Sequence, residues 1–110
     1  MIAAWERRLA SYNKINSHAF VEGSPEDKAC WAEVDAAERL IRESVATTPQ
    51  GVEVQLWTAL YHSADFDHAI DDLAAIRGDL AYFDGHEPSL DWNTRLTLAA
   101  IRSLRAMGSR

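Results

Sequence analysis

Apolar residues recur along this chain at the three- and four-residue spacing of amphipathic helices, and runs of β-branched residues are absent. Three breaks rich in glycine and proline separate the periodic segments, at residues 23–25, 48–51 and 85–88. Ser24 precedes Pro25, and Thr48 precedes Pro49, which is the order of an N-cap and a first-turn proline. The pattern predicts an all-α fold, a compact single-domain bundle of four or five helices over residues 1–110.

The expected helices run over residues 2–20, 25–45, 49–83 (as one helix or two) and 89–107. Their inward faces are expected to carry Trp5, Leu9, Tyr12, Asn16 and Phe20 in the first, Cys30, Trp31, Val34, Ala37, Ile41 and Val45 in the second, and Trp92, Leu96, Ala99, Ala100, Leu104 and Met107 in the last. Arg95, Arg102 and Arg105 are then expected on the opposite side of the last helix. Gly108 is expected to cap it.

The segment from Phe66 to Phe83 has a heptad pattern, and the apolar spacing also continues unbroken through residues 63–65. A single helix over 49–83 would be roughly 50 Å long at 1.5 Å per residue. A domain of this size has no core of that length, so we expect a break near residues 63–65. Beside the heptad seam, Asp65, Asp72 and Asp79 recur seven residues apart.

Acidic residues are concentrated between residues 53 and 91, where Arg77 is the single basic residue. The acids of this stretch are Glu53, Asp65, Asp67, Asp71, Asp72, Asp79, Asp84, Glu87 and Asp91. The formal net charge is −6. A segregated acidic surface does not suit a protein that binds nucleic acid or an anionic membrane, so neither partner is expected.

The remaining composition is that of an ordinary globular protein. One cysteine, Cys30, excludes an intramolecular disulfide and a cysteine metal cluster, and it suits a reducing compartment. No stretch reaches the ~20 apolar residues of a membrane span. The first residues lack the apolar run of a secretory signal. We expect a cytoplasmic protein without a cofactor.

Candidate chemistry gathers at residues 62–72. Asp65-x-x-His68 has the carboxylate–histidine spacing of helical di-iron proteins, but a second such pair is absent. A metal site is therefore an alternative, and a solvated acidic face is the favoured interpretation. Cys30 is interpreted as a packed thiol, and His18 and His86 have no obvious partner. No nucleophile elbow, phosphate-binding glycine loop or zinc-protease motif occurs, so the chain is not expected to be an enzyme.

Two surfaces are candidates for contact with another protein. The acidic candidates are Asp65, Asp67, Asp71, Asp72, Asp79 and Asp84. The Asp65, Asp72 and Asp79 row either pairs with Arg95 and Arg102 of the last helix or stays available, imitating the phosphate spacing of a nucleic acid. The aromatic candidates are Trp57 and Tyr61, next to Val54; their alternative is burial in the core.

Three segments resemble small uncharacterised helical proteins of alphaproteobacteria and their prophages. They are Trp5-Glu6-Arg7-Arg8-Leu9-Ala10-Ser11-Tyr12, Asp35-Ala36-Ala37-Glu38, and Ala46-Thr47-Thr48-Pro49-Gln50-Gly51-Val52. The acidic segment over residues 62–87 departs from that group. The resemblance implies an accessory protein of a mobile element, and it carries over no site residue.

Together these observations predict a small acidic protein that binds another protein with a basic surface and has no enzymatic activity. Given the resemblance, the most specific version of this prediction is a phage-encoded inhibitor of a host nucleic-acid-handling complex. Two alternatives stay open. One is a self-associating module in which Val54, Trp57 and Tyr61 form a homodimer, and the other is a carboxylate–histidine metalloprotein.

Overall fold

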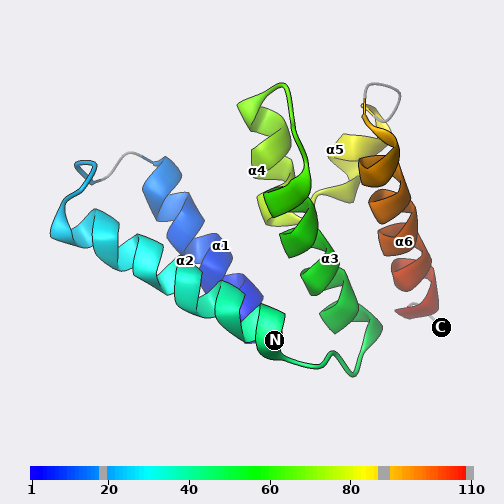
Figure 1. The fold of residues 1–110 in the computed structure, drawn as a ribbon, viewed down its shortest axis with the longest axis horizontal. Coiled ribbons are helices and arrows are strands. Elements are labelled where there is room, and N and C mark those ends of the chain that lie inside the picture. Colours follow the sequence, from blue (N-terminus) through cyan, green and yellow to red (C-terminus); the bar gives the residue numbers. More distant parts are fainter. Residues whose placement is uncertain (18–19, 87–89, 109–110) are drawn as a thin grey trace. The chain divides into compact units, whose positions relative to one another are not determined.

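A computed structural model describes residues 1–17, 20–86 and 90–108. Within these ranges the helices are α1 (Ile2–Asn16), α2 (Pro25–Glu43), α3 (Pro49–Ser63), α4 (Ala69–Arg77), α5 (Leu80–Asp84) and α6 (Trp92–Gly108) (Figure 1). No strand occurs in the described ranges, so the all-α prediction is confirmed. The predictions that concern His18, Glu87, Pro88 and Ser89 lie outside the described residues. None of the described helices is long and apolar enough to cross a membrane.

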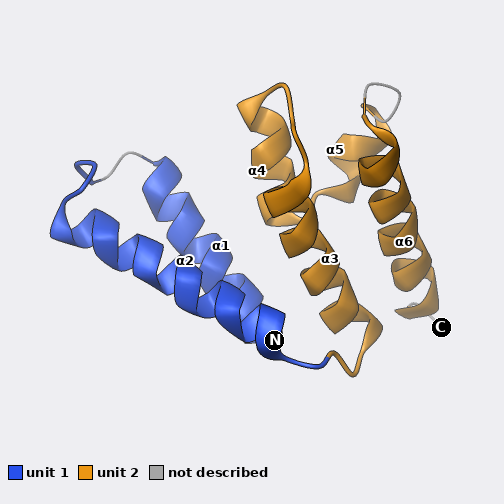
Figure 2. Cartoon of the chain, viewed as in Figure 1, with its two compact units in different colours: residues 1–45 blue, residues 46–110 orange. Residues whose placement is uncertain are grey.

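The contacts of the chain cluster in two compact units, residues 1–45 with α1 and α2, and residues 46–110 with α3 to α6 (Figure 2). Each unit contains buried apolar residues of its own. The single-domain boundary over residues 1–110 stays a prediction.

The first unit is a pair of packed helices. The hydroxyl of Ser24 accepts a hydrogen bond from the backbone of Asp27 and caps α2, as its sequence position predicts. Val34, Ala37 and Ile41 are buried along one face of α2. Three expectations for the inward faces are wrong: Trp31 is 42% exposed, Val45 is 89% exposed, and Asn16 is also exposed. Val45 is exposed because α2 ends at Glu43.

A cation is buried in the first unit. Arg8 has no exposed area, and its Nε donates to Glu38 at 2.9 Å. The guanidinium carbon lies 5.1 Å from the ring centroid of Trp5 and 4.9 Å from that of Tyr12. Two aromatic rings and a carboxylate therefore replace the water that a surface arginine would have.

The second unit is built around α3, which packs against both α4 and α6. Thr48 caps α3 by accepting from the backbone of Gly51 at 3.1 Å. The ring of Trp57 lies 5.9 Å from that of Phe83, and Phe83 in turn stacks on Phe66 at 5.7 Å. The core of this unit consists of Val54, Trp57, Leu60, Ala74, Ala75, Ile76, Leu80, Phe83, Leu98 and Ile101.

The segment over residues 49–83 is three helices. The expected break near residues 63–65 is confirmed, because α3 ends at Ser63. A second break, which the heptad pattern conceals, follows Arg77. Gly78 has φ 67°, and the backbone N–H groups of Gly78 and Asp79 return to the carbonyls of Ala75 and Ala74. This is a Schellman ending of α4, and the side chain of Asp79 then caps α5.

The inward face of α6 differs from the expected one. Thr94, Leu98 and Ile101 are buried, whereas Trp92, Leu96 and Met107 are 73%, 55% and 61% exposed. The helix has apolar residues on two sides, and the side with Leu98 and Ile101 meets the rest of the unit. Trp92 lies two residues from Thr94, which is about 200° around the helix, so the prediction chose nearly the opposite face.

Candidate functional site

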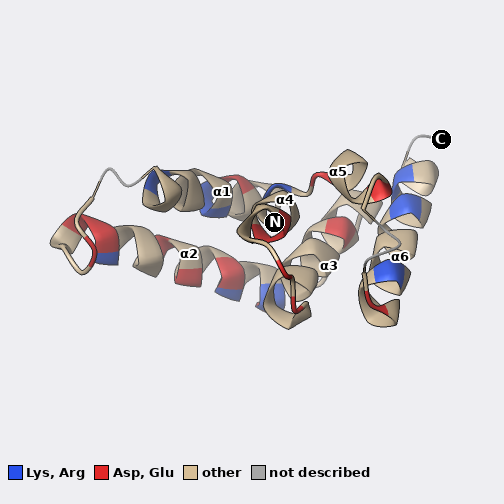
Figure 3. Ribbon diagram, turned by 90° about the horizontal axis from the view of Figure 1, so that it is seen from above, with Lys and Arg blue, Asp and Glu red and all other residues tan. Residues whose placement is uncertain are grey.

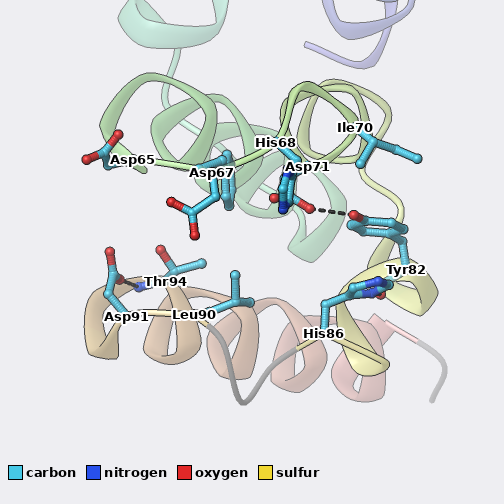
Figure 4. Close-up of a pocket in the computed structure, with 11 residues that line it drawn as sticks. Asp65, Asp67, His68, Ile70, Asp71, Tyr82, His86, Leu90, Asp91 and Thr94 are labelled. Carbon is cyan, nitrogen blue, oxygen red and sulfur yellow. Dashed lines mark hydrogen bonds between the residues drawn. The ribbon is translucent and has the colours of Figure 1, made fainter.

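A cleft of about 540 Å³ opens in the second unit, where the loop between α3 and α4 faces the end of α5 and the start of α6 (Figure 4). It lies wholly within residues 65–94. The side chains that line it are Asp65, Phe66, Asp67, His68, Ile70, Asp71, Tyr82, His86, Leu90, Asp91 and Thr94. None of these described residues is a lysine or arginine, so the cleft is acidic.

Local capping places both walls. On one wall, α3 ends at Ser63, and the extended residue His68 begins α4, so residues 65–68 form a loop above the cleft. On the other wall, Asp91 accepts from the backbone N–H of Thr94 at 2.7 Å and starts α6. This backbone hydrogen bond, with further bonds from Thr94 and Asn93, lowers the pKa of the Asp91 carboxyl.

The two walls are tied together by Asp71 of α4 and Tyr82 of α5. Asp71 is only 9% exposed, and its Oδ1 accepts a hydrogen bond from the Tyr82 hydroxyl (Figure 4). That bond, with burial and the charge of Asp71, raises the pKa of Tyr82. Burial first, and then the charge of Asp71, also raises the pKa of neighbouring Asp72. Asp71 therefore contributes to the raised pKa values of both Tyr82 and Asp72.

The second oxygen of Asp71 accepts no hydrogen bond from the described residues. This oxygen is not among the buried side-chain atoms of the described residues that lack a partner, so it is open to the water of the cleft. A carboxylate oxygen placed in this way in a cleft is suited to a donor supplied from outside the chain.

Three further aspartates line the cleft. Asp65 and Asp67 are exposed in the loop, where neither makes a hydrogen bond or ion pair with a described residue, and Asp91 is exposed on the opposite wall. Two histidines complete the polar lining. His86 stacks on Tyr82 with ring centroids 4.2 Å apart, and its Nδ1 donates to the Tyr82 carbonyl at 2.6 Å. His68 is exposed at the start of α4.

The predicted acidic residues do not all meet. Asp65, Asp67 and Asp71 line the cleft, and half-buried Asp72 lies outside the lining. Asp79 caps α5 by accepting from Tyr82 N at 3.2 Å. Asp84 binds Arg102 at 2.6 Å.

The predicted row of Asp65, Asp72 and Asp79 does not exist as one helix face, because the three residues lie in a loop, in α4 and at the start of α5. Nor does it pair with the last helix as one alternative proposed. Basic residues recur along α6 (Figure 3), but Arg102 binds Asp84, and Arg105 binds Glu53 at 3.0 Å and the carbonyl of Gly78.

The aromatic surface also needs correction. Trp57 is 1% exposed and Val54 is 5% exposed, so both belong to the core. The indole N–H of Trp57 donates to Glu53 at 3.1 Å, which satisfies it inside the unit. Tyr61 is half-buried, with its ring edge-on to His62. The core alternative holds for Trp57, because α3 packs against both α4 and α6 and the Trp57 ring contacts Phe83.

Asp65 and His68 do not have the geometry that the metal-site alternative requires. Asp65 and His68 lie in the loop before α4 and do not project from one helix turn as the di-iron spacing requires. Among the described residues, no group of three or more potential ligands could hold a metal ion.

Sequence reasoning missed Tyr82, His86 and Asp91 as members of one site. Tyr82 and His86 enter the site because α4 ends at Gly78 and Asp79 caps α5, and the sequence signal for this was a glycine followed directly by a capping aspartate. Asp91 enters it as the cap of α6. Comparisons of the chain with protein-family models, with curated proteins and with solved structures found no match. The resemblance to prophage proteins stays a prediction.

Proposed function

We propose that this chain is a non-enzymatic protein-binding protein whose acidic cleft receives a basic side chain of another protein. The observation that carries the proposal is the largely buried residue Asp71, one of whose carboxylate oxygens accepts from no described donor, in a cleft lined by three more aspartates. A lysine or arginine side chain supplies both the donor and the opposite charge.

The rest of the lining supports this choice of ligand. Phe66, Ile70 and Leu90 provide apolar wall on which the methylene stem of a long basic side chain can pack. Charged groups in a partly enclosed cleft also interact more strongly than at an open surface, because less water screens them. The cleft therefore combines attraction for charge with contact area for the stem.

The proposal extends to the kind of partner. A basic protein surface is typical of proteins that handle nucleic acids, and the resemblance to prophage proteins implies an accessory protein of a mobile element. We propose inhibition of a host nucleic-acid-handling complex in the cytoplasm, with the cleft engaging one basic side chain rather than a row of aspartates imitating phosphates. Self-association through Val54, Trp57 and Tyr61 is not proposed, because the first two are buried.

Titration with a hexaarginine peptide, followed by NMR, tests the proposal. Shifts are expected at the backbone amides of residues 65–71, 82 and 91–94, and binding should weaken steeply with salt. A hexacitrulline peptide, which has a similar shape without the charge, should not bind.

A matched pair of variants separates cleft binding from the general attraction of an acidic protein. Asp65→Asn/Asp67→Asn removes two charges from the cleft, and Glu6→Gln/Asp35→Asn removes two exposed charges from the first unit. The first variant should lose most of the affinity and the second should keep it. Equal losses would refute the cleft as the contact.

A further inference from the structure

The carboxylates of the acidic cleft lie at two positions. Asp67, in the loop before α4, and Asp91, on the opposite wall, point toward each other, whereas Asp71 lies further along the cleft beside Tyr82 (Figure 4). Among the described residues, no three potential ligands come close enough together to hold a metal ion. The acids are therefore too widely spread for a single compact ion, and they suit an extended cation that reaches both positions.

Both positions carry negative charge. The hydrogen bond from the Thr94 backbone lowers the pKa of the Asp91 carboxyl, so this group stays ionised well into acid. The charge of Asp71 contributes to the raised pKa of its neighbour Asp72. No described residue of the lining is a lysine or arginine that could lie between Asp67 and Asp91. Two facing carboxylates repel each other, and a cation between them replaces this repulsion by attraction.

The size and the apolar lining of the cleft suit a chain between two charges. Its volume of about 540 Å³ is that of sites that enclose a whole small molecule, roughly 300–1,000 Å³. Leu90 lies between Asp91 and His86 along one wall (Figure 4). Phe66 also lines the cleft, and its ring is held by stacking on Phe83 at 5.7 Å. Methylene groups that join two cations can pack on these side chains.

We propose that the cleft has a second cation position, between Asp67 and Asp91, besides the one at Asp71. Its preferred ligand then carries two positive charges joined by an aliphatic chain, as in a linear diamine or in two neighbouring basic side chains of a partner. This inference rests on the proposed function, because it concerns the same cleft and the same class of ligand. It adds that recognition requires two charges at once.

The test compares ligands that differ by one charge. Calorimetry at pH 7.5 measures the dissociation constants of a series of linear diamines and of the monoamines of the same chain length. The best diamine should bind roughly tenfold more tightly than its monoamine, because it makes one more charge-assisted hydrogen bond. A second arm compares a diarginine peptide with the same peptide in which citrulline replaces one arginine, and it separates a partner's side chains from a free amine.

Three variants locate the two charges. Asp71→Asn removes the charge from the first position but keeps an oxygen that can accept from the Tyr82 hydroxyl, and it should abolish the advantage of the second ligand charge. Asp67→Asn leaves Asp91 at the second position, so the advantage should fall to about threefold. Asp35→Asn, at an exposed position in the first unit, should leave it unchanged. Because Asp67 is exposed in a loop, its variant tests the inference even if Asp71→Asn disturbs the fold.

The outcomes distinguish the two proposals. Absence of binding by every ligand, the hexaarginine peptide included, would refute both. Binding of hexaarginine in the cleft without an advantage for the second charge in either arm would refute the second position and leave the proposed function standing. An advantage confined to the diamines, with no peptide bound in the cleft, would support the two positions and overturn the protein partner. An advantage that survives in both cleft variants would overturn the inference.

Discussion

Arg8 and Glu38 form an ion pair between α1 and α2 in which the cation has no exposed area and the carboxylate side chain is 13% exposed. The pair contrasts with Arg7 and Glu33, one position along α1, whose side chains are 47% and 41% exposed. The same two helices therefore carry a buried pair and an exposed pair side by side.

Removal of Glu38 should destabilise the first unit strongly. Glu38→Ala leaves the charge of Arg8 without its carboxylate in a buried position, and breaking such pairs typically costs about 3 kcal/mol or more. Glu33→Ala is the matched control, since it removes the exposed partner, and it should change the free energy of unfolding little. Urea unfolding followed by circular dichroism measures both. Equal effects of the two substitutions would contradict the burial of Arg8.

Truncation of Trp57 and truncation of Trp92 should change the free energy of unfolding by very different amounts. Trp57 packs on Phe83 in the core, so Trp57→Ala is expected to cost about 3–5 kcal/mol. Trp92 is 73% exposed, and Trp92→Ala should stay within about 0.5 kcal/mol of the wild type. Chemical denaturation of both variants tests the inward face of the helices. A large loss with Trp92→Ala would show that the predicted face of α6 is covered after all.

Two glycines that end helices should differ because of backbone conformation. Gly78 has φ 67°, where a β-carbon is strained, so Gly78→Ala should cost about 1–2 kcal/mol. Gly85 has φ −85°, and among the described residues an added β-carbon would meet the Tyr82 carbonyl oxygen, at 3.8 Å. Gly85→Ala should be neutral or slightly stabilising, up to about 1 kcal/mol. Thermal unfolding of the pair is the measurement, and similar melting temperatures would argue against the left-handed ending of α4.

Asp91 should make the stability of the second unit depend on pH in acid. Its pKa is lowered in the folded state by the bond from the Thr94 backbone, so its contribution is complete above the ordinary aspartate value of about 3.9. The contribution is lost as the pH falls through the lower folded value. Asp91→Ala should therefore reduce the Tm at pH 7, and the difference from the wild type should shrink below about pH 4. Asp35→Ala, at an exposed position outside any cap, should show no such convergence.

The sequence predicts the helices better than the faces they bury. Ser24 and Thr48 cap their helices by hydrogen bonds to backbone N–H groups three residues further on, so their role can be predicted from the local sequence. The break after Ser63 could be predicted because a small core cannot cover a helix of about 50 Å. The second break at Gly78 was concealed because the heptad spacing passes through it without a change of register. A glycine in the left-handed region overrides such periodicity.

The face of α6 depends on neighbours that periodicity cannot identify. Leu96 and Leu98 lie on opposite sides of the helix, and either side could be covered. The cleft could likewise be predicted only in part. Asp65, Asp67 and Asp71 lie close together in the sequence, so the sequence predicts them as one group. Tyr82 and Asp91 join them only through the tertiary path of the chain.

The junction of Gly78 and Asp79 determines how α5 is oriented relative to α4. The left-handed Gly78 fixes the direction in which the chain leaves α4, and the Asp79 cap fixes where α5 begins. Insertion or deletion of one residue at this point would swing the phenol of Tyr82 away from the Asp71 carboxylate, even though every amino acid of the cleft would still be present. In relatives of this chain, the spacing of eleven residues between these two side chains would be a better marker of an intact site than the number of acidic residues.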